Sequence, residues 1–421
     1  MEKFHLVGIK GTGMSALAGI LHDLGHSVTG SDVPEDFFTT KKLKDRNIKI
    51  LPFDKKNIEA GKTYIASSCY REDNEEVAEI LRKGLPLYYY HEFLGNFFKN
   101  TKIGISGTHG KTTTTSLVAK FFEDKKIAYL IGDGSGGADK DYEYFIFEAC
   151  EYRNHFLKYD FDYLVINNIE LDHPDFFKDV EAIADSFQKA AAKAKNVIVN
   201  ADDENCRKIK HPRIFSFGLA DGDLRGKILD ASAEGFQIEI NHLGDVRKFF
   251  LPFTGVYMVF NFLAALSVAF LNGISFEEVS EKLATYVRPS RRMEEYHYHD
   301  NVIIDDYAHH PREIEMCLAG IKQKYPNKDL IVIFQPHTYS RTLALQTEFR
   351  KVFSGVKLYL AETFTSKREA NNKNLEKMVF DSFPEARVFR KKKIKEFKNL
   401  RNTVLLFLGA GNIDRYIQEF V

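Results

Sequence analysis

Residues 104–115 read GISGTHGKTTTT, and this segment constrains the chain more than any other. The stretch TKIGIS, which leads into it, is β-leaning and apolar, and the stretch SLVAKFF after it has the apolar spacing of a helix. Strand, glycine-rich loop and helix in this order form the context in which backbone N–H groups bind nucleotide phosphates. The segment therefore predicts an ATP-binding loop within an α/β domain.

Each residue type in this loop suits the binding of phosphate. Gly107 and Gly110 let backbone N–H groups approach phosphate oxygens. Lys111 supplies a mobile cation at the start of the helix, and the hydroxyl of Thr112 can ligate Mg²⁺. The common P-loop has a glycine where this chain has Ile105, so the loop is an irregular example of its class. A glycine turn without a ligand is the alternative interpretation.

The composition indicates a globular protein of several domains. The length of 421 residues gives a prior of about three domains, and 44% of the residues are hydrophobic, which is ample for sizeable cores. Lys plus Arg and Asp plus Glu each number 59. This balance gives no sign of a nucleic-acid partner or of an anionic membrane surface, so any anion binding must be local.

Cysteine usage and the N-terminus indicate a cytoplasmic protein. The four cysteines are scattered without the spacing of a metal site or a disulfide framework. The N-terminal residues MEKFHLVGIKGTG enter a strand at once and lack the basic and long apolar segments of a signal peptide. The apolar stretch 256–271 is shorter than the ~20 residues that span a bilayer. It therefore predicts a buried helix, and we expect no membrane partner.

Strand and helix patterns alternate along the chain, which predicts an α/β fold of three tandem domains. Residues 1–98 are expected to form a Rossmann-like domain, and residues 99–286 a central α/β domain of the P-loop ATPase type. Residues 287–421 are expected to form a second Rossmann-like domain. Within the central domain, residues 214–248 alternate in polarity and contain glycines, so they predict antiparallel strands or hairpins.

The first domain opens with a strand, a glycine turn and a helix. Gly8, Gly11 and Gly13 lack the GxGxxG spacing of dinucleotide-binding enzymes, which disfavours a nicotinamide oxidoreductase. The turn can still hold a diphosphate at the helix N-terminus, and Asp32 after the second strand can accept a hydrogen bond from a ribose or a base. Ser67 follows another strand, at an edge where ligands of open α/β sheets bind.

Two strands of the central domain end in side chains that suit a metal ion. Glu148 ends the apolar stretch FIFE, and Asp172 and His173 follow the stretch YLVINNI. In a parallel sheet both ends should lie near the phosphate loop, where a carboxylate and an imidazole can hold Mg²⁺ against phosphate oxygens. The alternatives are that Glu148 only begins a helix and that His173-Pro174 is only a turn.

Two adjacent arginines stand where the second and third domains meet. Arg292 suits a γ-phosphate, because an arginine from a mobile domain stabilises charge that develops in phosphoryl transfer. We expect Arg291 to lie in an exposed basic turn. The segments DDYAHHP and FQPHTYSRT follow the next strands and predict one substrate pocket. Zinc ligation by His309 or His310 is the alternative there, but no further ligands have the expected spacing.

Nine segments distributed over essentially the whole chain resemble the Mur ligase family, the ATP-dependent amide-bond-forming enzymes of peptidoglycan precursor synthesis. They are GIKGTGMSALA, SSCYREDNEE, GTHGKTTTT, FEACE, NIELDHPD, SRRMEE, DDYAHHPREI, FQPHTYSRT and LGAGNI. The loop form GTxGKT is the one that this family uses, which accounts for the missing first glycine. The third-domain pair DDYAHHP and FQPHTYSRT is the most specific, because ligases of the family differ there.

The resemblance implies a role for each site residue. The residues it assigns to ATP are Gly107, Thr108, Gly110, Lys111, Thr112, Thr113, Asn261 near adenine and Asp306 near ribose. Those it assigns to the metal are Thr112, Glu148 and His173. The uridine diphosphate sugar would lie along Gly11, Asp32 and Ser67, and the incoming amino acid would meet Tyr307, His309 and Arg341. The catalytic residues would be Lys111, Arg292 on the γ-phosphate side, and His109 facing the reacting carboxylate.

The implied reaction uses ATP and Mg²⁺ to join L-alanine to the lactyl carboxylate of UDP-N-acetylmuramate through an acyl phosphate. A relative that attaches a murein tripeptide to the same nucleotide sugar and a non-catalytic nucleotide-binding relative are the alternatives. Three positions need comment. Tyr257-Met258 replaces the family's usual His-Asn, Thr338 stands where many relatives have Arg, and Lys189 is the nearest candidate for carbamylation, with an ordinary surface lysine as the alternative. The sequence leaves the oligomeric state open.

Overall fold

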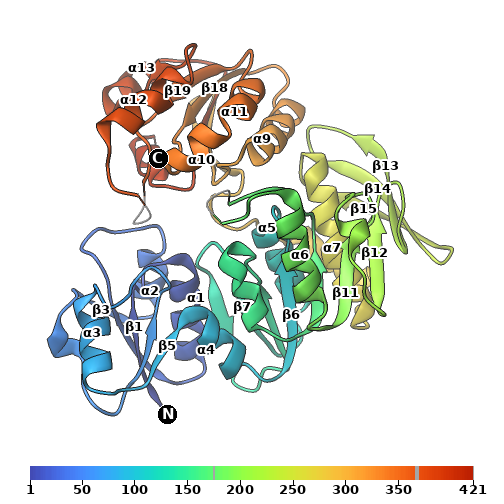
Figure 1. Cartoon of the computed structure of the whole chain (residues 1–421). Helices are drawn as coiled ribbons and strands as arrows, with labels where there is room; N and C mark the ends of the chain where they lie inside the picture. Colours follow the sequence, from blue (N-terminus) through green and yellow to red (C-terminus); the bar gives the residue numbers. More distant parts are fainter. Residues whose placement is uncertain (174–175, 366–368, 421) are drawn as a thin grey trace.

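The computed structural model describes residues 1–173, 176–365 and 369–420. Within these ranges the strands form three sheets, one after another along the chain. Figure 1 shows the resulting arrangement, with the N-terminal part in blue beside the central part and the C-terminal part in orange and red across the top of the central one. The predicted α/β fold of three tandem domains is confirmed.

The N-terminal sheet is parallel, in the order β3-β2-β1-β4-β5. Its strands are β1 (Lys3–Val7), β2 (Ser27–Ser31), β3 (Lys49–Leu51), β4 (Thr63–Ala66) and β5 (Leu87–Tyr89). The helices between and after them are α1 (Thr12–Asp23), α2 (Thr40–Asp45), α3 (Glu75–Arg82) and α4 (Tyr90–Phe97), with a 3₁₀ turn η1 (Lys55–Asn57). Strand order reverses on either side of β1, so the carboxyl edge near β1 is a topological switch point of the kind where ligands bind.

The central sheet runs in the order β15-β14-β13-β12-β11-β10-β6-β9-β7-β8. Its strands are β6 (Thr101–Ser106), β7 (Ile127–Leu130), β8 (Gly136–Ala138), β9 (Tyr144–Glu148), β10 (Phe161–Ile166), β11 (Ala194–Asn200), β12 (Ile214–Gly218), β13 (Leu224–Ala231), β14 (Phe236–His242) and β15 (Asp245–Leu251). Its helices are α5 (Lys111–Phe121), α6 (Val180–Ala191), α7 (Val256–Leu271) and α8 (Phe276–Ala284), with 3₁₀ segments η2 (Tyr152–Lys158) and η3 (Cys206–Lys208). The strand β6 that precedes the phosphate loop therefore lies between β10 and β9.

The expectation for residues 214–248 is correct only in part. β13, β14 and β15 are antiparallel, as predicted, but β12 pairs in parallel with β11 and extends the parallel part of the sheet. The chain between β11 and β12 crosses back through η3, so β12 starts at the same end of the sheet as β11. The alternating sequence of a short strand did not reveal this direction.

The central sheet is buried on both faces, and its side chains alternate between them. On β9, Phe145 and Phe147 pack into one core, which also contains residues of α6, and Ile146 packs into the other, together with α5, α7 and α8. This period of two is the ordinary consequence of strand geometry. The predicted buried helix is α7, whose bounds coincide with the apolar stretch 256–271. Among the described residues, no helix combines the length and apolar character that a bilayer crossing requires.

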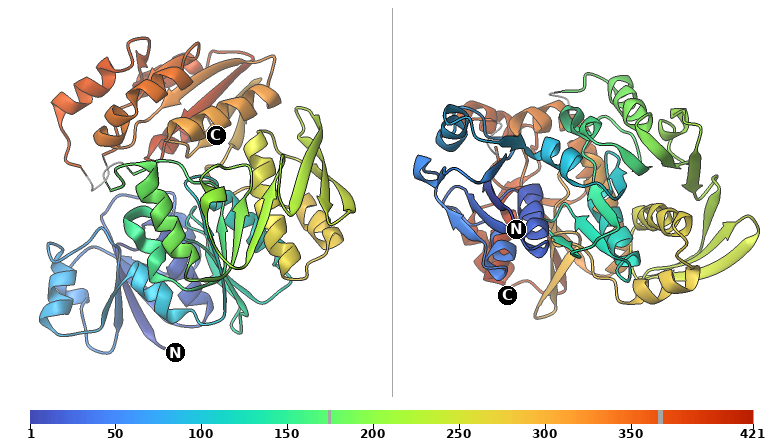
Figure 2. Two further views of the ribbon diagram at one scale, coloured as in Figure 1. Left: turned by 45° about the vertical axis from the view of Figure 1, so that its right-hand side comes forward. Right: turned by 90° about the horizontal axis from the view of Figure 1, so that it is seen from below.

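The C-terminal sheet runs in the order β16-β17-β21-β18-β19-β20, parallel except for the antiparallel pair β16 and β17. Its strands are β16 (Glu294–Tyr298), β17 (Asn301–Asp306), β18 (Asp329–Phe334), β19 (Lys357–Leu360), β20 (Arg387–Val388) and β21 (Thr403–Leu408). Its helices are α9 (Pro311–Lys324), α10 (Tyr339–Ala344), α11 (Gln346–Val352), α12 (Lys373–Asp381) and α13 (Ile394–Phe397), with η4 (Lys391–Lys393) and η5 (Ile413–Glu419). The two further views in Figure 2 show the same part lying over the central one.

The predicted domain boundaries, after residues 98 and 286, fall between elements. Helix α4 ends at Phe97 and β6 begins at Thr101, whereas α8 ends at Ala284 and β16 begins at Glu294. These boundaries stay predictions. For the site, the important consequence is that residues 285–293 connect the central and C-terminal parts close to the phosphate loop.

Candidate active site at the domain interface

The loop between β6 and α5 has the backbone geometry of a tight cradle. Gly107 has φ of +130° and Gly110 has φ of +82°, a region that residues with a Cβ rarely adopt. A Cβ on Gly110 would lie 2.3 Å from Oδ1 of Asn261, and one on Gly107 would lie 2.9 Å from the Cβ of Asn167. Both glycines are therefore required by the close approach of neighbouring chain segments as well as by their dihedral angles.

Lys111 begins α5 and lies against the loop. Its Nζ donates to the carbonyl of Gly107 at 2.5 Å and to that of Thr108 at 3.0 Å, and it forms an ion pair with Glu151 at 3.0 Å. Burial alone would lower the pKa of the Lys111 ammonium, but the Glu151 carboxylate raises it above its usual value. Lys111 is therefore a permanent cation at the end of the phosphate loop.

Glu148, at the end of β9, lies on the same side of the loop. It accepts a hydrogen bond from the N–H of Gly132 at 2.7 Å. The hydroxyl of Thr112 and the positive charges of Lys111 and Arg292 also favour its ionised form. Burial nevertheless raises the pKa of the Glu148 carboxyl above its usual value. A carboxylate beside a hydroxyl provides oxygen atoms of the kind that Mg²⁺ prefers.

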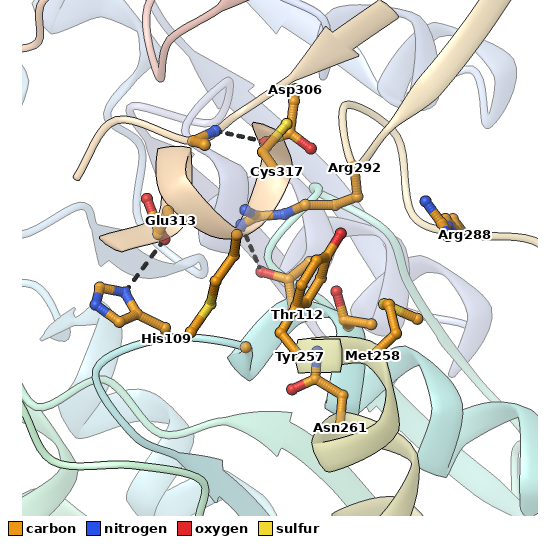
Figure 3. A pocket seen from close by; sticks show the side chains of 14 residues that line it. His109, Thr112, Tyr257, Met258, Asn261, Arg288, Arg292, Asp306, Glu313 and Cys317 are labelled. Carbon is orange, nitrogen blue, oxygen red and sulfur yellow. Dashed lines mark hydrogen bonds and ion pairs between the residues drawn. The ribbon is translucent and has the colours of Figure 1, made fainter. Parts of the chain in front are cut away.

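Arg292 connects the C-terminal part with the phosphate loop. Its Nη2 donates to Oγ1 of Thr112 at 3.1 Å, and its guanidinium lies 5.2 Å from the centroid of the Tyr307 ring. Figure 3 shows this arginine extending from the segment before β16 toward Thr112, across a small cavity. The cavity is about 60 Å³ in volume, which is far below the ~300 Å³ or more of a typical ligand pocket. The two sides of the cavity therefore lie close together in this structure.

The walls of this cavity come from both domains. Thr113 and Asn261 belong to the central domain, while Asp306 and Glu313 belong to the C-terminal one. The carboxylate of Asp306 accepts from the N–H of Met293 and from the N–H of Ala308, each at 2.8 Å. Tyr257 and Met258 also line the cavity. Of the residues that the sequence assigned to ATP, Gly110, Thr112, Thr113, Asn261 and Asp306 thus line this one cavity.

A cluster of buried imidazoles and carboxylates lies next to the cavity. Nε2 of His109 is 3.5 Å from Glu170, and Nδ1 is 3.5 Å from Glu313 of the first turn of α9. Burial acts to lower the pKa of His109, but the two carboxylates raise it to about 9. Burial lowers the pKa of the nearby His309 to about 4, although its Nδ1 lies 3.3 Å from Glu313. At neutral pH His109 is therefore positively charged, whereas the neighbouring His309 is neutral.

Arg341 makes the third contact between the domains. Its Nη2 lies 3.3 Å from Oδ1 of Asp172 and 3.4 Å from Nδ1 of His173. His173 in turn lies 3.5 Å from Glu151, the partner of Lys111. Burial acts against ionisation, but Arg341 and the surrounding histidines hold the pKa of Asp172 well below its usual range. The predicted amino-acid receptor and the predicted metal ligand are thus direct neighbours. Pro174, the other residue of the turn considered at this position, lies outside the described residues.

Family models match three consecutive parts of the chain. The model of the Mur ligase family catalytic domain matches residues 3–102, that of the Mur ligase middle domain matches residues 105–269, and that of the Mur ligase glutamate ligase domain matches residues 291–411. The UDP-N-acetylmuramate–L-alanine ligase of Lacticaseibacillus casei is 39% identical over 99% of this chain and 97% of its own length. The chain belongs to the Mur ligase family.

Solved structures agree with this assignment. The UDP-N-acetylmuramate-alanine ligase of Thermotoga maritima is 26% identical and superimposes with a TM-score of 0.84, over 100% of this chain and 98% of that one. A murein peptide ligase from Psychrobacter arcticus has a TM-score of 0.76 at 20% identity, over 100% and 98% of the two chains. The MurF ligase of Thermotoga maritima in complex with ADP has a TM-score of 0.63 at 16% identity, over 93% and 94%. The last two likenesses show the fold alone.

The expectation that Arg291 of this Mur ligase lies in an exposed basic turn is wrong. Its side chain is 3% exposed, its Nε lies 3.1 Å from Asp305, and its two terminal nitrogens donate to the carbonyls of Gly411 and Gly409. These carbonyls follow β21, far along the sequence, and require buried donors. The backbone at Arg291 and Met293 has positive φ, so the turn presents Arg292 to the central domain while Arg291 anchors it.

Sequence reasoning assigned no role to Glu151, Glu170 or Glu313 of this Mur ligase. Each is paired with a residue that the sequence did assign, namely Lys111 for Glu151 and His109 for the other two. Glu151 and Glu170 stand in the quoted segments FEACE and NIELDHPD, and Glu313 in DDYAHHPREI. A carboxylate within a motif that already contains a candidate was the available signal.

The three residues expected along the nucleotide sugar lie at the carboxyl edge of the N-terminal sheet. Gly11 is the N-cap of α1, Asp32 follows β2, and Ser67 follows β4. The carboxylate of Asp32 accepts from the N–H of Lys10 at 2.7 Å and from that of Val33 at 2.8 Å. These residues form a group apart from the cavity at the phosphate loop. Lys189 is exposed on α6, as an ordinary surface lysine would be.

Proposed function

We propose that this Mur ligase joins L-alanine to the lactyl carboxylate of UDP-N-acetylmuramate, with ATP converted to ADP and phosphate. The supporting observation is the 39% identity over 99% of the chain to a ligase named for this reaction. The site agrees in its chemistry, because Lys111, Thr112 and Arg292 meet where the central and C-terminal domains touch. The expected cytoplasmic location stays a prediction.

The phosphate loop suits ATP on geometric grounds. Gly107 and Gly110 form a cradle that any Cβ would fill, and the loop leads into the N-terminus of α5, which favours anions. Lys111 would lie along the phosphates, and Thr108 and Thr113 complete the same surface. On the opposite wall, Asn261 would contact adenine and Asp306 the ribose. Since the cavity is small in this structure, ATP would enter with the C-terminal domain displaced.

The residues around Thr112 fit Mg²⁺. We propose Thr112, Glu148 and His173 as its ligands. The first two supply oxygen atoms beside the phosphate loop, and Nε2 of His173 lies 3.5 Å from Glu151, the ion-pair partner of Lys111. Among the described residues, no group of three or more His, Cys, Asp or Glu side chains is arranged to hold a metal ion by itself. Phosphate oxygens would have to complete the coordination. When bound, the ion would neutralise charge on the phosphates.

The chain's own residues account for the first half of the reaction. A carboxylate is a poor acylating agent, so an oxygen of the lactyl carboxylate first attacks the γ-phosphorus of ATP, and the bond to the ADP oxygen breaks. Lys111 and Arg292 lie on two sides of the loop and would compensate the charge that spreads over the transferring group. His109, in the same loop, would face the reacting carboxylate. The product is an acyl phosphate.

The second half forms the amide. The amine of L-alanine attacks the acyl carbon, a C–N bond forms, and the tetrahedral intermediate collapses with loss of phosphate and a proton. We propose that Arg341 binds the amino acid's carboxylate and that Tyr307 and His309 line its site. In this structure Arg341 donates to the carboxylate of Asp172, and this contact supports a carboxylate as the partner of its guanidinium. The uridine diphosphate sugar would extend from this centre to Gly11, Asp32 and Ser67.

Phosphate release tests the proposed function directly. Purified protein with UDP-N-acetylmuramate and ATP should release phosphate on addition of L-alanine. Release only with a murein tripeptide would assign the chain to peptide recycling, and release with neither would favour a non-catalytic protein.

A substitution in the loop tests the mechanism. Lys111→Ala should lower turnover about 1000-fold, because one preorganised charge at the transferring group is removed. Lys120→Ala is the matched control, since Lys120 lies on the same helix and forms an ion pair with the partly exposed Glu123, away from the phosphate loop. Near-normal turnover of Lys111→Ala would contradict the assignment of this loop.

A further inference from the structure

His109 of the phosphate loop lies between two carboxylates that belong to different domains. Glu170 follows β10 in the central domain, whereas Glu313 lies in the first turn of α9 in the C-terminal domain. The two distances to the imidazole nitrogens are both 3.5 Å, and the His109 side chain is 5% exposed. Figure 3 shows the contact of His109 with Glu313 at the side of the cavity.

The backbone of His109 is fixed independently of its ring. Its N–H donates to Oδ1 of Asn168 at 2.8 Å, and its carbonyl accepts from Nδ2 of the same side chain at 3.2 Å. The backbone that carries the ring is therefore held by contacts that do not involve the two carboxylates. Neither ring nitrogen has a well-aligned hydrogen bond in the structure, so the arrangement depends on charge.

The protonation state of the ring follows from this geometry. A neutral imidazole has one nitrogen with a lone pair, and that lone pair would point at one of the two carboxylates. Only the doubly protonated ring offers a donor to both. Burial opposes the charge, but the carboxylates raise the pKa of His109 to about 9. The other charged or titratable groups around the cluster include His309, His310, Arg312, Asp172, Arg292, Arg341, Asp306 and Cys317.

Glu313 is itself held in place by the start of α9. Its Oε2 accepts from the N–H of His309 at 3.1 Å and from that of His310 at 3.3 Å, as the reciprocal half of a capping box. Its Oε1 is the atom that faces His109. The helix N-terminus thus determines where the second carboxylate meets the phosphate loop.

We propose that Glu313 is a positioning residue of the ligase reaction, which orients His109 across the domain interface and keeps it positively charged beside the phosphate loop. This inference rests on the proposed function. Because Glu313 belongs to the C-terminal domain, the second carboxylate is in place only when that domain contacts the central one. Closure of the domains therefore completes a charged donor next to the carboxylate that receives the phosphoryl group. It also means that His109 does not serve as the base for the incoming amine at neutral pH.

The variant Glu313→Gln tests this role. Glutamine is accepted at this capping-box position, so α9 should keep its N-terminus while the charge is lost. We expect the alkaline limb of the kcat–pH profile to move down by about one pH unit, which corresponds to about a tenfold lower kcat on that limb. The matched control is Glu315→Gln on the same helix, where Glu315 pairs with Arg312 on the exposed side. Its profile should match that of the unmodified enzyme. Superimposable profiles for Glu313→Gln and the unmodified enzyme would overturn the proposal.

A second measurement separates this inference from the proposed function. The imidazole ¹⁵N shifts of His109, assigned with a His109→Gln variant, report its charge without any substrate. The pKa should be above 8 in the unmodified protein and should fall by about one unit in Glu313→Gln. If the protein releases no phosphate but His109 titrates in this way, the proposed function is contradicted, while the effect of Glu313 on the charge of His109 is supported. An active protein whose His109 titrates identically in both forms would contradict the role of Glu313 alone.

Discussion

The central domain meets its two neighbours through interfaces of different kinds. Toward the N-terminal domain it shares one continuous apolar core, which contains Phe4, Leu17 and Phe93 from the first domain and Phe145 and Phe187 from the second. Toward the C-terminal domain, ion pairs and hydrogen bonds cross the interface, and the two cores of that domain draw on residues from Met293 onward. The first two domains are therefore expected to behave as one body, to which the third is attached by contacts that water can replace.

Close backbone approach reinforces the first interface. Helix α1 packs on β8, where a Cβ on Gly136 would lie 2.2 Å from the carbonyl oxygen of Ala16, and a Cβ on Gly19 would lie 2.7 Å from the carbonyl oxygen of Gly136. Such close packing stabilises the contact and prevents α1 from shifting along β8. The second interface instead includes the polar contacts of His109 with Glu313, Arg341 with Asp172, and Arg292 with Thr112. The lesson is that the protein places its chemistry at the interface that can open.

The largest expected effect comes from a substitution that disrupts the packed interface between the first two domains. Gly136→Ala should lower the free energy of unfolding by about 3 kcal/mol, because the new methyl group meets backbone atoms of Ala16 that cannot move aside. Urea denaturation followed by circular dichroism measures the change. Gly137→Ala is the matched control, since the atoms nearest to its Cβ belong to the Tyr129 side chain, at 3.0 Å, and not to the backbone. Equal effects of the two substitutions would show that the α1–β8 contact is looser than described.

The next effect separates catalysis from stability at the polar interface. Arg292→Ala should lower kcat about 100-fold, which corresponds to about 2.7 kcal/mol, because a charge aimed at the transferring phosphoryl group is lost. The urea midpoint should change little, since the direct contacts of Arg292 with its neighbours are a hydrogen bond with Thr112 and a ring contact with Tyr307, beside weaker charge interactions with Glu148 and Asp306. A marked loss of stability with preserved kcat would reverse the distinction between the two interfaces.

A smaller effect concerns pH. The pKa of His109 is raised to about 9 from the ordinary value of 6.5, so its stabilising contribution is fully present below pH 6.5 and is lost as pH rises through 9. The share that depends on Glu313 should weaken the contact of the C-terminal domain by about 1 kcal/mol between pH 7 and pH 10. Small-angle X-ray scattering should show a larger radius of gyration at pH 10. An unchanged radius, or an opening of the packed interface instead, would contradict this prediction.

The smallest expected effect concerns an ion pair at the edge of the packed interface. Lys42 pairs with Asp133 at 3.0 Å and contacts Ser135, so it joins the first two domains at the edge of their shared core. Lys42→Ala should lower the free energy of unfolding by about 0.5 kcal/mol, because a partly exposed ion pair contributes little. Thermal unfolding measures this change. A loss as large as that of Gly136→Ala would show that charge, and not packing, joins these domains.

Local patterns predicted much of the fold and part of the site. The alternation of strands and helices predicted the α/β class, and the loop GISGTHGKTTTT predicted a cradle between a strand and a helix, which β6 and α5 confirm. Patterns failed where a distant segment decides the outcome. β12 runs parallel because β11 lies beside it, and Arg291 is buried because carbonyls after β21 require its donors. No periodicity near residues 214 or 291 contains that information.

The sequence by itself determined which residue types are available and where the glycines permit a phosphate cradle. This follows because backbone dihedral preferences and helix N-termini are local properties. Only the tertiary structure decided which charges meet. His109 and Glu313 lie far apart in the chain, and their contact exists because the C-terminal domain lies over the carboxyl ends of the central strands. The charge of an imidazole depends on burial and on its nearest carboxylates, and folding alone brings these together.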